Sequence, residues 1–79
     1  MGCGKSHDWI NVYNDQKAGI RVRIDNAEGV WIEPATSSTI NLQKAKEKVR
    51  VTIRFNGSFD ETREGIKTGR KWLSSDILG

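Results

Sequence analysis

The residue types used most often in nucleophilic and acid–base catalysis are scarce in this chain. It contains one cysteine, Cys3, and one histidine, His7, which is followed by Asp8. A histidine beside a carboxylate can act as an oriented general base, but no serine or cysteine has a reason to lie against this pair. Catalysis also needs preorganised groups, which a chain terminus does not provide. We therefore expect a non-enzymatic protein with a solvent-exposed His7 and no catalytic residues.

Metal and nucleotide sites are not predicted either. A single cysteine and a single histidine cannot form a disulfide framework or a typical tetrahedral zinc site. The sequence Gly4-Lys5-Ser6 matches the end of a phosphate-binding loop, but the glycine five positions earlier and the preceding strand are missing. The glycine spacing in 65–71 does not fit that motif. We expect no cofactor and no bound metal.

The N-terminal hexapeptide carries the most specific motif. Met1-Gly2-Cys3-Gly4-Lys5-Ser6 fits the N-myristoylation pattern, and Cys3 beside Gly2 is typical of dually acylated eukaryotic proteins. One acyl chain holds a protein only weakly, with K on the order of 10⁴ M⁻¹, whereas a second chain makes attachment stable. This interpretation places lipids on Gly2 and Cys3, at the cytoplasmic face of a membrane.

The same residues support a second interpretation. Gly2-Cys3-Gly4-Lys5-Ser6 resembles the start of a mature bacterial lipoprotein, in which a small residue precedes the lipidated cysteine. The resemblance covers about five residues and implies a membrane-associated protein in the periplasm or on the cell surface, with Met1 and Gly2 in place of a signal peptide. A third interpretation is an ordinary flexible terminus without lipid, in the cytoplasm.

The elements that must position any binding residues are predicted to be β-strands. The chain has 79 residues, of which 35% are hydrophobic, and a formal net charge of +3. The chain contains eight isoleucines and five valines but only three leucines. Isoleucine and valine have β-branched side chains, which suit a pleated surface. Apolar and polar residues alternate with a period of two, which is typical of strands with one buried face. The alternating segments are 9–13, 20–24, 30–33, 40–43 and 49–55.

Regular spacing of these segments predicts a small all-β domain. We expect an antiparallel β-sandwich or barrel of about five to six strands over residues 8–79, preceded by a flexible N-terminal segment, 1–7. Ser58 and Glu61 stand at capping-box spacing, so 58–64 is predicted to form one helical turn that Gly65 ends. Residues 35–39 are predicted as a loop, and the residues after 65 as a sixth strand or a packed tail.

The polar faces of the strands supply the candidate binding residues. If the apolar residues of 20–24 and 49–55 point inward, the arginines between them point outward and share a face when the two strands lie in one sheet. Exposed aromatic residues on the other strands would extend such a surface. The candidates are Arg21, Arg23, Arg50, Arg54, Trp9, Tyr13 and Trp31.

Three functions fit these observations. The first is a protein-binding β-domain tethered to a membrane by an N-terminal lipid, as in a small lipoprotein. The second is a structural or interaction component of a phage or secretion-type assembly that associates, with itself or others, through strand edges. The third is a basic β-barrel that binds single-stranded nucleic acid, which the net charge of +3 favours less.

Overall fold

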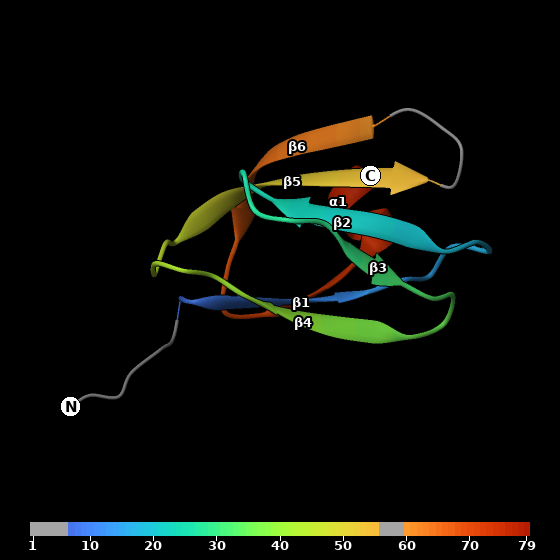
Figure 1. Cartoon of the computed structure of the whole chain (residues 1–79), viewed down its shortest axis with the longest axis horizontal. Coiled ribbons are helices and arrows are strands. Elements are labelled where there is room, and N and C mark those ends of the chain that lie inside the picture. Colours follow the sequence, from blue (N-terminus) through green and yellow to red (C-terminus); the bar gives the residue numbers. More distant parts are fainter. Residues whose placement is uncertain (1–6, 56–59) are drawn as a thin grey trace.

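The chain folds into two packed β-sheets with one short C-terminal helix (Figure 1). The structure is a computed structural model that describes residues 7–55 and 60–79. The strands are β1 (Trp9–Tyr13), β2 (Ile20–Ile24), β3 (Val30–Ile32), β4 (Ser37–Asn41), β5 (Lys48–Phe55), β6 (Asp60–Lys67) and β7 (Lys71–Leu73), followed by α1 (Ser74–Leu78). The predicted small all-β fold is confirmed, with seven strands in the described residues where five to six were expected.

The two sheets have different strand orders. One contains β4-β1-β7 and the other β3-β2-β5-β6. Four of the five strand pairings are antiparallel, as predicted, whereas β1 and β7 pair in parallel. A parallel pair needs a connection that crosses over rather than a tight hairpin. Here β7 follows β6 of the other sheet, so the chain returns to the first sheet in the direction of β1.

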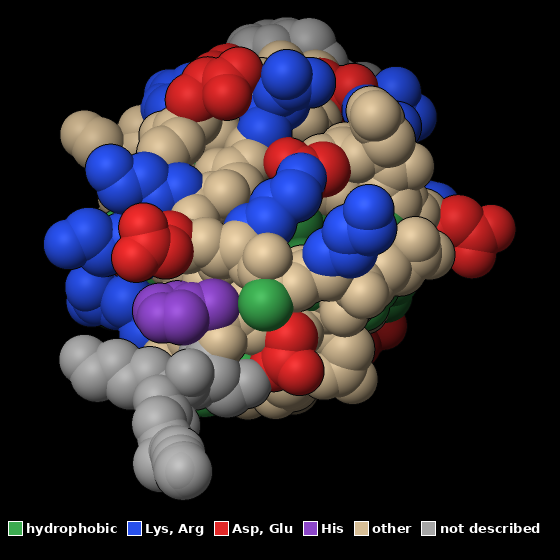
Figure 2. Space-filling view, turned by 90° about the vertical axis from the view of Figure 1, so that its left-hand side faces the viewer, with side chains coloured by type: hydrophobic (Ala, Val, Ile, Leu, Met, Phe, Trp, Pro, Cys, Tyr) green, Lys and Arg blue, Asp and Glu red, His purple; other side chains and the backbone are tan. Residues whose placement is uncertain are grey.

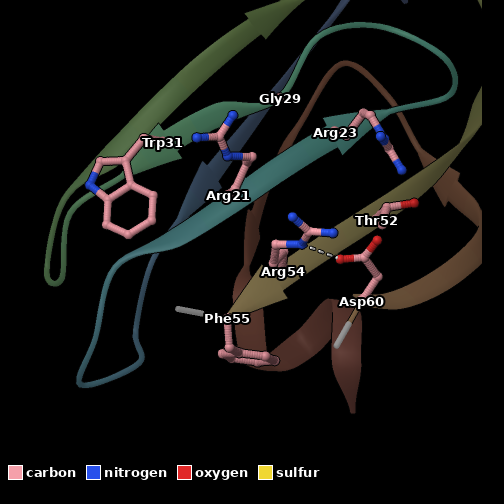
Figure 3. A pocket seen from close by; sticks show the side chains of 8 residues that line it. All are labelled: Arg21, Arg23, Gly29, Trp31, Thr52, Arg54, Phe55 and Asp60. Atoms are coloured by element: carbon pink, nitrogen blue, oxygen red, sulfur yellow. Dashed lines mark hydrogen bonds and ion pairs between the residues drawn. The ribbon is translucent and has the colours of Figure 1, made fainter. Parts of the chain in front are cut away.

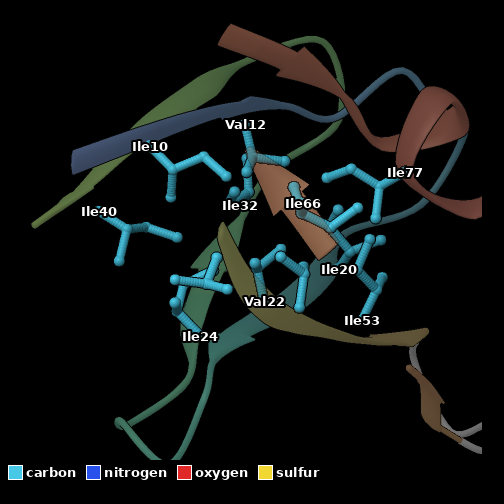
Figure 4. Close-up of a cluster of buried hydrophobic side chains, with 12 residues drawn as sticks. Ile10, Val12, Ile20, Val22, Ile24, Ile32, Ile40, Ile53, Ile66 and Ile77 are labelled. Atoms are coloured by element: carbon cyan, nitrogen blue, oxygen red, sulfur yellow. The ribbon is translucent and has the colours of Figure 1, made fainter. Parts of the chain in front are cut away.

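A thin core between the sheets consists of β-branched residues. All twelve buried hydrophobic side chains in the described residues are Ile or Val, and they include all eight isoleucines of the chain (Figure 4). On β2 the burial alternates strictly, with Ile20, Val22 and Ile24 inside and Arg21 and Arg23 outside. The alternation of apolar and polar residues in the sequence therefore determines which face of β2 is buried in the core.

The segment predicted as a helical turn is a strand in its described part. Ser58 lies outside the described residues, but Asp60 to Glu64 belong to β6, which pairs with β5 through six residue pairs. Cross-strand hydrogen bonding to the long neighbouring strand outweighs a local capping signal. Gly65 does not end the element but lies within β6, where its φ of +72° is a conformation that glycine adopts at no steric cost.

A buried asparagine connects the β1–β2 loop to the end of β3. The side chain of Asn14 is fully buried, and its amide donates hydrogen bonds to the carbonyls of Ala18 (2.9 Å) and Ile32 (3.0 Å). Its Oδ1 accepts one from the amide of Gln16 at 2.9 Å. These bonds hold the β1–β2 loop against the end of β3. The loop predicted over 35–39 is shorter than expected, because β4 begins at Ser37.

Asp15 fixes the start of the C-terminal helix. Its Oδ1 accepts hydrogen bonds from Oγ of Ser74 (2.5 Å) and from the amide of Ser75 (3.1 Å), and its Oδ2 accepts one from Oγ of Ser75. These bonds lower the pKa of Asp15, the bond from Ser74 having the largest effect. The carboxylate thus caps α1 from a distant loop, and α1 places Ile77 in the core. Within the described residues, no helix is long and apolar enough to span a bilayer.

Candidate functional site

The arginines predicted to share a face do so on the outer side of the four-stranded sheet. Arg21 on β2 lies opposite Arg54 on β5, and Arg23 lies opposite Thr52. All three arginines are exposed, whereas Thr52 is buried among its neighbours. Because residues paired across antiparallel strands point to the same side of the sheet, the three guanidinium groups project from one surface.

Trp31 completes this surface from β3. It lies opposite Arg21 in the antiparallel pairing of β2 and β3, and 46% of its surface is exposed. Its Nε1–H donates a hydrogen bond to Oε2 of Glu33 at 2.9 Å, which fixes the orientation of the ring. An aromatic ring held flat on a sheet offers an apolar contact beside a cation at little entropic cost.

Two glycines make room for these side chains. A Cβ on Gly19 would lie 2.1 Å from Cζ2 of Trp31, and a Cβ on Gly29 would lie 2.6 Å from Cγ of Arg21. Both distances are below any real contact between carbon atoms. The indole therefore lies across the backbone at Gly19, and the stem of Arg21 lies across the backbone at Gly29.

Together these residues surround a shallow depression of about 340 Å³ (Figure 3). Figure 3 shows Trp31 at one side and the three arginines along β2 and β5. The lining residues are Arg21, Arg23, Gly29, Trp31, Thr52, Arg54, Phe55 and Asp60. The depression combines guanidinium donors with aromatic surface, which suits an anionic group next to an apolar one.

Carboxylates on β6 neutralise two of the four predicted arginines. Nε of Arg54 lies 2.8 Å from Oδ1 of Asp60, and Nε of Arg50 lies 3.0 Å from Oε2 of Glu64. Both pairs are exposed to solvent, so each contributes little to stability. Their main effect is to reduce the positive potential along the β5–β6 side of the face.

Arg21 and Arg23 have no carboxylate partner in the described part of the chain. Their guanidinium groups therefore keep their full donor capacity for a ligand. Arginine binds a carboxylate or a phosphate through two parallel hydrogen bonds. The free positive charge of the face is thus concentrated on β2, beside Trp31.

Comparisons with known protein families, with curated proteins and with solved structures found no match for this chain.

A second depression of about 460 Å³ continues the face toward the β2–β3 turn, and both Arg23 and Arg50 line it. Asp25 lies at the edge of this depression, and its backbone adopts the left-handed conformation, with a φ of +52°. Burial alone would raise the pKa of Asp25, but the amide of Arg50 donates to its Oδ1 at 3.0 Å and Nζ of Lys46 lies 3.1 Å from its Oδ2. The net effect lowers the pKa of Asp25, so this carboxylate remains ionised.

The other two predicted aromatic residues do not belong to this face. Trp9 and Tyr13 lie on β1, in the three-stranded sheet, and both are half-buried. They share the side of β1 opposite to the core residues Ile10 and Val12. Trp9 and Tyr13 therefore lie apart from the arginines and Trp31, because β1 and β2 belong to different sheets.

The N-terminal candidates lie outside the described residues. This applies to Gly2, to Cys3 and to residues 1–6 of the predicted flexible segment. His7 is described and is half-buried rather than exposed, with Nδ1 3.4 Å from Oγ1 of Thr68. Within residues 7–55 and 60–79, no group of three or more His, Cys, Asp or Glu side chains could hold a metal ion.

Proposed function

We propose that this chain is a non-enzymatic protein-binding β-domain and that the outer face of β3-β2-β5-β6 binds an acidic segment of its partner. The observation that supports this most is the pair of unpartnered guanidinium groups, Arg21 and Arg23, beside the exposed ring of Trp31. A partner carboxylate would accept hydrogen bonds from the arginines, while an adjacent apolar side chain would pack on the indole.

The distribution of charge favours a protein over a single-stranded nucleic acid. A nucleic-acid backbone that crossed all four strands would bring phosphates toward Asp60 and Glu64, which already occupy Arg54 and Arg50. Only two free arginines remain on the face, and they are two residues apart on one strand. Two neighbouring arginines are enough to bind a short acidic peptide segment. Binding of a nucleic-acid backbone requires cations along the whole path of the strand.

The test uses two probes of equal charge. One is the acetylated peptide Glu-Glu-Phe-Glu-Glu, and the other is an oligothymidylate of matching net charge. We expect the peptide to bind more tightly, and the variant Arg21→Gln/Arg23→Gln to weaken peptide binding about tenfold, which corresponds to about 1.4 kcal/mol. The matched control Lys44→Gln/Lys71→Gln removes the same charge elsewhere and keeps the affinity. Tighter, strongly salt-dependent binding of the oligonucleotide would instead favour the nucleic-acid function.

We also propose that the domain is tethered to a membrane by lipid at Gly2 or Cys3. The pattern Met1-Gly2-Cys3-Gly4-Lys5-Ser6 supports the tether, because it fits both an acylation signal and a lipoprotein start. Intact-mass measurement on protein from the native host tests it. A mass increased by an acyl or diacylglyceryl group is expected, and an unmodified mass for most molecules would contradict it.

A second candidate function is assembly through a strand edge, and β4 favours it. In the described residues β4 bonds only to β1, and its residues Ser37–Asn41 include no charge. Natural proteins often protect edge strands with charged side chains that discourage pairing. Analytical ultracentrifugation over a wide concentration range tests this function: concentration-dependent association supports it, and a strict monomer contradicts it.

A further inference from the structure

Two lysines face each other at one end of the longest strand pair. Lys48 begins β5, Lys67 ends β6, and the two are directly opposite in the antiparallel register. Both are exposed, and neither has a carboxylate partner among the described residues. Like charges directly opposite each other destabilise a sheet. An anion bound between them would remove that repulsion.

A third cation lies beside the lysines. Arg70 follows the turn after β6, and its guanidinium carbon lies 4.5 Å from the centroid of the Trp72 ring. Lys48, Lys67 and Arg70 line one depression of about 650 Å³. Its other lining residues are His7, Trp9, Glu47, Thr68 and Gly69. The lining of this depression thus contains three cations and one carboxylate, that of Glu47.

The backbone beneath these side chains is held by hydrogen bonds. Thr68 is buried, and its amide donates to the carbonyl of Glu47 at 3.0 Å. The amide of Gly69 donates to the carbonyl of Trp9 at 2.6 Å, and the indole N–H of Trp72 donates to the carbonyl of Lys67 at 2.8 Å. The cations therefore have fixed attachment points on one surface. Figure 2, which faces this end, shows several Lys and Arg side chains to the left of the histidine, with Asp and Glu side chains also present on this face.

We propose that this basic end, defined by His7, Lys48, Lys67 and Arg70, docks on an anionic membrane surface. The cations would contact lipid phosphate and carboxylate groups. Trp9, half-buried in the same depression, belongs to the residue type that prefers the membrane–water interface.

The place where the candidate lipid sites join the described domain favours a membrane over other anions. His7 lines the depression, and Cys3 is four residues earlier in the chain. Four residues span at most about 14 Å, so a lipid on Cys3 would hold this end close to the bilayer. The choice of a membrane as the binding partner of this surface therefore rests on the proposed tether. The presence of the basic end does not depend on the tether.

The resulting orientation leaves the proposed partner-binding face accessible. Arg54 lies six residues after Lys48 on β5, which corresponds to about 20 Å along the strand. The depression that contains Arg21 and Trp31 is therefore displaced from the membrane-facing end by most of the length of the sheet. The domain could dock on lipid and bind its partner at the same time.

The test uses the unlipidated chain, so that its outcome does not depend on the tether. NMR line broadening is measured at low ionic strength with vesicles of equimolar phosphatidylcholine and phosphatidylserine, and with vesicles of phosphatidylcholine alone. Broadening is expected only with the mixed vesicles and first around Lys48, Lys67 and Arg70. A basic residue near an anionic surface changes partitioning about fivefold, so Lys48→Gln/Lys67→Gln should weaken it about 30-fold.

The partner-face variant Arg21→Gln/Arg23→Gln is the matched control, because it removes the same charge from another surface. It should keep vesicle binding, while Lys48→Gln/Lys67→Gln should keep binding of the acidic peptide. Equal loss in both variants would show that net charge alone drives partitioning and would overturn the docking surface. The absence of line broadening would also overturn it. The same holds if inorganic phosphate saturates Lys48, Lys67 and Arg70 and no vesicle binding is seen. An unmodified native mass would contradict only the tether.

Discussion

Arg21 and Trp31 lie opposite each other on β2 and β3, and each side chain crosses the backbone of a glycine. Trp31 lies over Gly19, and Arg21 lies over Gly29. The free cation and the exposed aromatic ring of the candidate face are thus positioned by two residues that have no side chain. The geometry of the face depends on these glycines as much as on the residues that would contact a ligand.

Replacement of Gly19 by alanine should displace the Trp31 ring. The new Cβ would overlap Cζ2 of the indole, and the exposed ring can swing outward, so we expect a stability loss of less than about 1 kcal/mol. The hydrogen bond from Trp31 to Glu33 should break. The indole N–H signal of Trp31 in NMR measures this, with the signals of Trp9 and Trp72 as internal controls. An unchanged Trp31 signal would contradict the packing described here.

Replacement of Asp60 and Glu64 by their amides should strengthen anion binding. Asp60→Asn/Glu64→Gln raises the formal net charge from +3 to +5 and frees Arg54 and Arg50. Affinity for the acidic peptide should increase several-fold, while stability changes by less than about 1 kcal/mol because both pairs are exposed. Titration of the peptide at two salt concentrations measures the change. The same gain in Glu28→Gln/Asp76→Asn would mean that only net charge matters.

Asn14 should be intolerant of substitution. Asn14→Ala removes three hydrogen bonds and leaves the carbonyls of Ala18 and Ile32 without their donor. The expected loss in the free energy of unfolding is about 2–3 kcal/mol, a large share for a domain of this size. Asn14→Asp should cost at least as much, since a carboxylate oxygen would then face the two carbonyls. Urea unfolding measures both, and a loss below about 0.5 kcal/mol would contradict the role of Asn14.

Stability should fall in acid because two carboxylates are bound in their ionised form. The pKa of Asp15 is lowered by hydrogen bonds from Ser74 and Ser75. The pKa of Asp25 is lowered because the Arg50 amide and Lys46 outweigh the effect of burial. A lowered folded-state pKa means that the unfolded chain binds protons more tightly. The stabilisation is therefore complete above the unfolded value, near 3.8, and is lost as the pH falls through the lower folded values.

The double variant Asp15→Asn/Asp25→Asn tests this pH dependence. It should be less stable than the original chain at neutral pH and lose less stability on acidification, so that the two curves converge below the folded pKa values. Urea unfolding as a function of pH measures both curves, with Glu28→Gln/Asp76→Asn as a charge-matched control. Parallel curves for the original chain and the double variant would contradict the assignment.

The sequence predicts the strands whose inner residues are Ile or Val. On β1, β2 and β5 the alternation is close to continuous, and the core contains the predicted residues. The sequence does not predict β6 as a strand, because Ile66 is its only buried side chain. The inner positions near its start are occupied by the half-buried charged residues Glu61 and Arg63. Its position depends on hydrogen bonding to β5, which no local pattern records.

The candidate face is only partly predictable for the same reason. Alternation places Arg21, Arg23 and Arg54 on outer faces, but strand order decides which residues meet. Trp31 joins them because β3 pairs with β2, whereas Trp9 is in the other sheet. Asp60 is set opposite Arg54 by the β5–β6 register. The acidic residues of 60–64 are a local signal for that pairing, but the capping-box spacing of Ser58 and Glu61 predicts a helical turn there instead.

The measurement that tests the central claim most directly is a map of backbone and indole NMR shifts on addition of the acidic peptide. We expect the largest shifts at Arg21, Arg23 and the Trp31 indole, with smaller ones at Arg54 and almost none at Trp9 or Tyr13. The shifts should disappear in Arg21→Gln/Arg23→Gln. If the peptide perturbs the basic end around Lys48 and Lys67 instead, or leaves Trp31 unchanged, the outer face of β3-β2-β5-β6 is not the partner-binding surface.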